Sequence, residues 1–182
     1  MTTFARLGLP ETIVHSLSKR GITEPFPVQA ATIPDVMAGK DVSGKAPTGS
    51  GKTLAFGLPM LARVDKAHKN KPRALILAPT RELAEQIKKE LTAPAKAVRR
   101  YVFAVYGGVG YGPQKQAFRK GVDVLVATPG RLEDLIEQRI VDLSQADIVV
   151  IDEADRMADM GFMPSVRRIL DQTSKQRQTL LF

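Results

Sequence analysis

The chain has 182 residues, 43% of them hydrophobic and 25% charged, which favours one globular domain with a sizeable core. It holds no cysteine and two histidines, which excludes a disulfide framework, disfavours thiolate or histidine metal sites and fits a cytoplasmic protein. Its net charge of +8 favours a polyanionic partner such as nucleic acid, and no apolar run approaches the roughly 20 residues of a membrane span.

The first 38 residues are predicted to form two short helices joined by a rigid proline turn. The first helix is opened by proline and runs from Pro10 to Leu17, with Gly21 as its expected C-cap. The second runs from Val28 to Met37 and carries Gln29 in its first turn. A short, weak strand from Asp41 to Lys45 is expected to follow.

Residues 46–53 read A-P-T-G-S-G-K-T, which indicates a phosphate-binding loop at a helix N-terminus. Gly49 and Gly51 allow the backbone to curl around a phosphate with its N–H groups pointing inward. Lys52 would supply a charge for the β- and γ-phosphates, and Thr53 a hydroxyl for Mg²⁺. The alternative is an ordinary Gly/Ser turn, and the loop opens on alanine where the strict pattern has glycine. The strand-like run before the loop and the helix-like run after it favour a nucleoside triphosphate site.

Strands and helices alternate through the rest of the chain. The helix after the loop contains Gly57 and Pro59, so a kink or an early end is expected there. The basic stretch 66–73 is expected to be a solvated surface loop. Apolar runs typical of buried strands lie at 74–78, 101–106, 122–127, 148–151 and 179–182, and helical stretches at 81–91, 114–120, 132–138 and 164–172. This alternation predicts one α/β domain, a parallel sheet with helices on both faces.

Ligands of such a sheet gather at the carboxyl ends of its strands. The run 148–151 is followed directly by Asp152 and Glu153, with Asp155 close behind. Carboxylates this close repel one another unless a cation is present. Asp152 is therefore a candidate Mg²⁺ ligand, and Glu153 a candidate base that polarises an attacking water. The alternative is a charged loop after a strand.

Three other strand ends are rich in Gly, Thr or Arg, which suits a sugar-phosphate backbone. Each alone is an ordinary strand-to-helix turn, but all three are expected on one edge of the sheet. Thr80 is a candidate N-cap for the helix that follows. No turn offers a pattern that would read bases, so nucleic-acid binding should be independent of the nucleotide sequence. The residues are Pro79, Thr80, Arg81, Gly107, Gly108, Thr128, Pro129, Gly130 and Arg131.

Together these stretches resemble the DEAD-box family of ATP-dependent RNA helicases, whose namesake tetrad matches residues 152–155. The resemblance covers nearly the whole chain. It implies a RecA-like fold of the P-loop NTPase class, ATP and Mg²⁺ as cofactors, and RNA as a partner of the three Gly-, Thr- and Arg-rich turns. It also accounts for Ala46, because the family's loop reads A-x-T-G-x-G-K-T.

The resemblance also assigns roles to single residues. Gln29 would hydrogen-bond the adenine edge, and Phe4 would lie near the base. Asp155 would connect the nucleotide site to the rest of the machine, and Gln116 and Arg119 resemble a further RNA-side motif, Q-x-x-R. Catalysis would fall to Lys52, Asp152 and Glu153, and the other nucleotide contacts to Thr48, Gly49, Ser50, Gly51 and Thr53.

The family continues, after a strand like 179–182, with Ser-Ala-Thr and a second RecA-like domain that carries arginine fingers. The resemblance therefore implies that residues 1–182 are the first core domain, which we expect to be monomeric and to bind ATP or ADP. We expect it to hydrolyse ATP feebly and to unwind nothing, since an arginine finger is worth about 10³–10⁵ in rate.

Two alternatives stay open at this stage. One is another P-loop NTPase, such as a GTPase. Residues 70–73 approach the guanine-reading motif N-K-x-D, but Arg73 replaces its carboxylate and the run lies early in the chain on a basic loop. The other is a nucleic-acid-binding module without catalysis.

Overall fold

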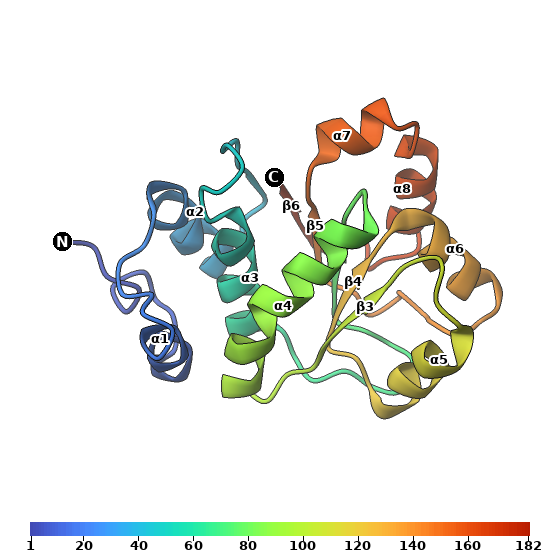
Figure 1. Ribbon diagram of the computed structural model, residues 1–182, viewed down its shortest axis with the longest axis horizontal. Coiled ribbons are helices and arrows are strands. Elements are labelled where there is room, and N and C mark those ends of the chain that lie inside the picture. The colour runs from blue at the N-terminus through green and yellow to red at the C-terminus, as the bar shows by residue number, and fades with distance from the viewer.

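The apolar runs form one six-stranded sheet in the computed structural model, which describes residues 1–182 (Figure 1). All pairings are parallel, and the strand order is β1-β6-β5-β2-β4-β3. The four strands β2, β4, β5 and β6 are flanked on both sides, and three of these four consist of buried residues alone. The strands are β1 (Val42–Ser43), β2 (Ala74–Leu77), β3 (Val102–Val105), β4 (Val124–Ala127), β5 (Ile148–Ile151) and β6 (Gln178–Leu181).

Helices cover both faces of the sheet, because side chains alternate between its faces along each strand. Ile76 of β2 packs into an apolar cluster with α1, α2, α3 and α4, whereas Leu75 and Leu77 pack into a second cluster with α5, α6, α7 and α8. The helices are α1 (Glu11–Ser18), α2 (Pro27–Met37), α3 (Lys52–Arg63), α4 (Arg81–Ala97), α5 (Tyr111–Lys120), α6 (Pro129–Glu137), α7 (Ala154–Asp159) and α8 (Met163–Leu170). The predicted α/β architecture is confirmed.

Several helices extend beyond their predicted bounds. α4 continues through Pro94 to Ala97 rather than ending at residue 91, and α5 and α6 begin at residues 111 and 129 rather than 114 and 132. α3 does not end early at Gly57 and Pro59 but continues to Arg63. Its residues from Leu54 to Leu61 are all buried, so tertiary packing offsets the hydrogen bond that Pro59 cannot donate. A Cβ at Gly57 would clash with the side chain of Leu91 of α4, which explains the glycine as a point of close helix packing.

The parallel topology separates two edges of the sheet. The phosphate loop, the 152–155 tetrad and the turns after β2, β3 and β4 all lie at the carboxyl edge, near α7 at the top of Figure 1. The connections that enter β2, β3 and β4 lie at the opposite, amino edge. No helix of the structure is both long enough and apolar enough to cross a membrane.

Candidate functional site

The phosphate loop joins β1 to α3 and leaves the first turn of α3 open. Gly49 and Gly51 have φ of +79° and +83°, which only glycine adopts without strain. No side chain caps α3, and the N–H groups of Lys52 and Thr53 have no backbone partner in the loop. A helix start with free N–H groups and a positive dipole end is suited to an anion.

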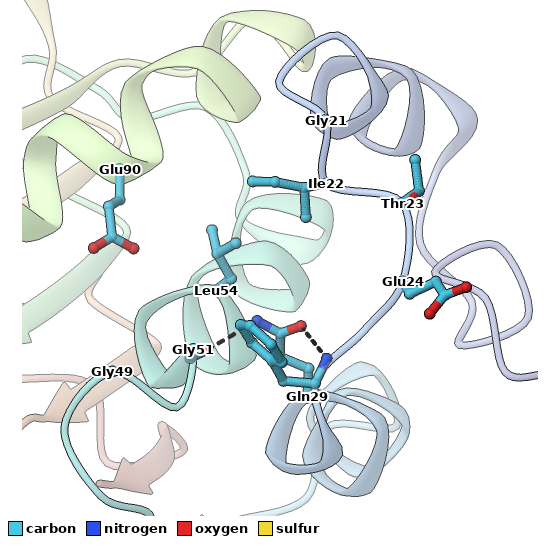
Figure 2. Close-up of a pocket in the computed structure, with 10 residues that line it drawn as sticks. Gly21, Ile22, Thr23, Glu24, Gln29, Gly49, Gly51, Leu54 and Glu90 are labelled. Atoms are coloured by element: carbon cyan, nitrogen blue, oxygen red, sulfur yellow. Dashed lines mark hydrogen bonds between the residues drawn. The ribbon is translucent and has the colours of Figure 1, made fainter.

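A cavity of about 470 Å³ lies beside this loop (Figure 2). Figure 2 shows Glu90 reaching toward it from α4 and Leu54 from α3, with Ile22 on the other side. The wall opposite the loop comes from the turn between α1 and α2. The lining residues are Gly21, Ile22, Thr23, Glu24, Phe26, Gln29, Gly49, Gly51, Leu54 and Glu90. Sequence reasoning found Gln29 and the loop glycines but missed Glu90, whose place depends on how α4 packs against α3.

Gln29 joins the two walls of this cavity. Its Oε1 accepts a hydrogen bond from the Phe26 N–H (2.9 Å), and its Nε2 donates to the Gly51 carbonyl (3.1 Å), as Figure 2 shows. A primary amide has two acceptor lone pairs and two N–H groups, so one of each remains for a ligand. A Cβ at Gly51 would lie 2.5 Å from Gln29 Nε2, so the contact requires glycine there.

Phe4 does not line the cavity, contrary to its assigned place near the base. It is 1% exposed and belongs to the apolar cluster around α1, α2 and α3. Burying the phenyl ring in the core removes its apolar surface from water and stabilises the fold, which an exposed position beside a ligand would not do. The aromatic side chain at the cavity is Phe26, which is 55% exposed.

Asp152 and Lys52 approach each other at the carboxyl edge. Lys52 Nζ lies 3.8 Å from Asp152 Oδ1, and Asp152 is 2% exposed. Burial raises the pKa of the Asp152 carboxyl from 3.8 to about 6; the Lys52 charge opposes this shift and the Glu153 charge adds to it. A carboxylate that is costly to ionise in the free protein is well placed to gain from an added cation.

This pKa predicts a pH dependence of stability. The folded pKa lies above the unfolded value, so the folded state holds the proton more tightly and stability falls as pH rises from about 4 to about 6. The loss is on the order of 3 kcal/mol. We expect Asp152→Asn to remove this fall and to raise the free energy of unfolding at pH 7, as measured by urea titrations at pH 4, 5, 6 and 7.

The exposed residue Asp159 of α7 provides the matched control, Asp159→Asn. The control should keep the wild-type pH profile. A wild-type profile in Asp152→Asn as well would contradict the assignment of the slope to Asp152.

Glu153 stands in an unusual backbone conformation at the start of α7. Its φ of +51° and ψ of +49° place it in the left-handed region, which costs a residue with a Cβ about 1 kcal/mol or more. Its carboxylate pairs with Arg156 (3.3 Å).

Asp155, two residues on, is exposed and lines a second cavity of about 480 Å³ together with Lys52 and Lys45. The tetrad thus adjoins the phosphate loop.

The three Gly-, Thr- and Arg-rich turns meet at one edge, because β4 lies between β2 and β3. Thr80 caps α4, accepting from the Leu83 N–H at 3.2 Å, as predicted. Arg81 is exposed, and its guanidinium lies 5.0 Å from the centroid of the Tyr106 ring. Gly107, Gly108 and Gly130 are exposed, whereas Pro79 and Pro129 are buried and Thr128 is half-buried.

Arg131 faces inward rather than into solvent. Its side chain is 10% exposed, lies over the Tyr111 ring and donates from Nη1 to the Val109 carbonyl (2.8 Å) and to Gln114 Oε1 (3.1 Å). Arg131 thereby holds the glycine turn after β3. Both bonds use Nη1 alone, so the predicted direct contact of Arg131 with RNA stays a prediction.

The Q-x-x-R assignment picked exposed residues, Gln116 and Arg119 of α5. The glutamine that the structure ties to the edge is Gln114, which is buried and bonded to Arg131. The signal for Gln114 is its spacing: it shares a helical face with Ala117 and Phe118, which are buried.

The guanine-reading alternative has no geometric support. Asn70 and Lys71 precede β2 and so lie at the amino edge, away from the phosphate loop. The Asn70 N–H and carbonyl bond to the backbone of Phe118 and Asp142.

The sequence pattern of the DEAD/DEAH box helicases matches residues 26–182. The chain belongs to this family. The resemblance found in the sequence is thus confirmed. Curated DEAD-box relatives match this chain along nearly its whole length. DEAD-box ATP-dependent RNA helicase 3A, chloroplastic, of Zea mays is 45% identical over 98% of this chain and 25% of its own length. The DEAD-box ATP-dependent RNA helicase CshA of Bacillus cereus is 43% identical over 100% of this chain and 34% of its own length.

A solved RNA helicase structure shares the fold. The RNA helicase Prp28 of Chaetomium thermophilum, bound to ADP, superposes with a TM-score of 0.90 at 42% identity. The match covers 100% of this chain and 45% of Prp28. The sheet described above is thus the RecA-like fold of the family. The chain spans 25% and 34% of the length of the two curated relatives described above.

Proposed function

We propose that these residues form the first core domain of an ATP-dependent RNA helicase. The observation that carries the proposal is the uncapped phosphate loop beside a cavity whose opposite wall is fixed by Gln29. This arrangement offers an anion site and an amide next to each other, as a nucleotide requires. We further propose a cytoplasmic location, which fits the lack of cysteine. We also propose that the 182 residues are monomeric on their own.

The phosphate side of the site would use three kinds of group. The free N–H groups at the start of α3 would bind the phosphate oxygens, and Lys52 would bind the β- and γ-phosphates by charge. Lys52 would then exchange part of its present contact with Asp152 for the nucleotide. Thr48, Gly49 and Ser50 would complete the loop around the phosphates. The Ser50 hydroxyl is buried without a partner in the free protein, so a ligand or water can satisfy it.

The donor set fits Mg²⁺. The structure brings one buried carboxylate, Asp152, close to the loop that carries the Thr53 hydroxyl, and no cluster of three or more acidic or histidine side chains forms. Mg²⁺ in nucleotide sites takes one or two protein ligands and completes its shell with phosphates and water. When bound, the ion would neutralise phosphate charge, and Glu153 would accept a proton from the attacking water.

The RNA backbone would lie on the turns after β2, β4 and β3. Arg81 is the exposed cation there, the glycines allow close backbone approach, and Arg131 would act by holding the turn at 107–110. Contacts of this kind read phosphate and sugar, so binding should not depend on sequence. The 182 residues alone should bind nucleotide but hydrolyse ATP slowly, because phosphoryl transfer depends heavily on an arginine finger supplied from elsewhere.

A competition assay tests the nucleotide assignment. With fluorescent ADP as the probe, we expect unlabelled ADP to compete at least about tenfold better than GDP, because the Gln29 amide can pair with the donor and acceptor of adenine. Gln29→Ala should weaken ADP binding and abolish the preference for ADP over GDP. Gln138→Ala, at an exposed position, is the control and should bind both nucleotides as the wild type does. Equal competition by GDP against wild-type protein would contradict the proposal.

A further inference from the structure

Basic side chains gather at the amino edge of the sheet, opposite the nucleotide site. The loop between α3 and β2 contains four Lys or Arg within residues 66–73. In Figure 1 this loop runs along the lower side of the molecule, as do the connections that enter β3 and β4. The role proposed above uses none of these residues.

A buried carboxylate brings the three connections together. Asp123 is 3% exposed; its Oδ1 accepts from the Ala67 N–H (2.6 Å) and its Oδ2 from the Tyr101 N–H (2.7 Å). The Asn70 N–H also bonds to the carbonyl of Phe118 at the end of α5 (2.9 Å). These bonds fix the backbone of the loop against the neighbouring connections. Its Lys and Arg side chains therefore project from an ordered segment.

Five residues flank the backbone positions that these bonds join, and we group them as the basic edge: Lys66, Lys69, Arg99, Tyr101 and Lys120. All five are exposed, and none of the four cations has an ion-pair partner. The acidic side chains nearby do not neutralise these four cations, because each is paired elsewhere or buried. Asp65 and Asp147 pair with Arg73, Asp142 pairs with Lys71, and Asp123 is buried. The basic edge therefore carries uncompensated positive charge.

Tyr101 indicates which polyanion fits. The residue is 44% exposed, and its ring packs against that of Phe103 with the two centroids 6.0 Å apart. An exposed aromatic ring within a basic surface is suited to stacking a nucleobase, worth about 1–3 kcal/mol in single-strand binding. An acidic peptide would use the charges but gain nothing comparable from the ring.

We propose that the basic edge is a second binding surface for single-stranded RNA, separate from the turns at the carboxyl edge. The choice of RNA as the polyanion rests on the proposed function. β2 is four residues long, so the two edges lie about 13 Å apart plus the depth of their turns. An RNA strand that leaves the carboxyl edge can therefore pass over the domain and meet the basic edge.

The test is RNA affinity at several salt concentrations, with a fluorescent 24-nucleotide single strand. Lys66→Glu with Lys69→Glu should weaken binding about tenfold in 50 mM salt and reduce the slope of log K against log salt by about 1.4, from two lost phosphate contacts. Tyr101→Ala should weaken binding about tenfold with the slope unchanged, and Tyr101→Phe should bind as the wild type. ADP binding should stay unchanged in all of these variants.

Lys19→Glu with Arg167→Glu is the matched control, since both cations are exposed and unpaired and lie at the end of α1 and within α8, outside the basic edge. The same loss of affinity and slope in the control, or competition by polyglutamate against wild type as strong as that by unlabelled RNA, would overturn the proposal. Arg81→Ala separates it from the carboxyl-edge site. If only Arg81→Ala weakens RNA binding, the basic edge is refuted; if only the Lys66 and Lys69 changes weaken it, the basic edge stands and the carboxyl-edge site fails.

Discussion

Lys52→Ala is expected to lower the affinity for ATP about 100-fold, because it removes a charge-assisted bond to the phosphates from a half-buried position. The change also leaves the buried Asp152 without its nearest cation, so its negative charge is no longer balanced beside the phosphates. Isothermal titration with a non-hydrolysable ATP analogue and Mg²⁺ measures the effect. Lys52→Arg should recover part of the affinity, since it keeps the charge but not the compact shape of the ammonium.

The control for this experiment is Lys40→Ala. Lys40 is an exposed lysine whose partner is Asp35 on the surface (2.8 Å), so its loss should leave ATP affinity unchanged. Circular dichroism at the titration temperature shows whether each variant is folded. Wild-type affinity in folded Lys52→Ala would refute the phosphate loop as the nucleotide site.

Glu153→Gln is expected to reduce the ATP hydrolysis rate by about 10²–10⁴ while leaving nucleotide affinity within a few-fold of wild type. An amide keeps the size of the side chain and one acceptor oxygen but cannot accept the proton of an attacking water. Because the isolated 182 residues should turn over slowly, the measurement is a single-turnover reaction with protein in excess over radiolabelled ATP, with and without RNA.

Glu137→Gln provides the matched change at an exposed position near the end of α6. Its rate should equal that of the wild type. Equal rates in Glu153→Gln would instead favour the non-catalytic nucleic-acid-binding module. A fall in ATP affinity as large as the fall in rate would assign Glu153 to binding rather than to proton transfer.

Local sequence determined the helices and strands and the residue types of the proposed nucleotide site. Each buried strand is a short apolar run between polar turns, and a strand with apolar residues on both faces has to be covered on both sides. The parallel order then places the residues after β1 and β5 on one edge, so Lys52 and Asp152 were predictable as neighbours.

Residues whose role depends on packing could not be predicted in the same way. Pro59 disfavours a helix, yet α3 continues through it because the helix lies buried between its neighbours. Phe4 matched a position assigned to the nucleotide, and its ring is instead part of the core. Arg131 matched an RNA-contacting motif, but its guanidinium is bonded to Val109 and Gln114.

The sequence by itself therefore determined the class of fold, the phosphate loop and the acidic tetrad, because glycine conformation, charge and strand periodicity act over a few residues. Only the tertiary structure decided which side chains face the cavity, which arginine is free and which connections share Asp123. Those outcomes depend on contacts between segments distant in the chain, where burial and hydrogen-bond satisfaction outweigh local preference.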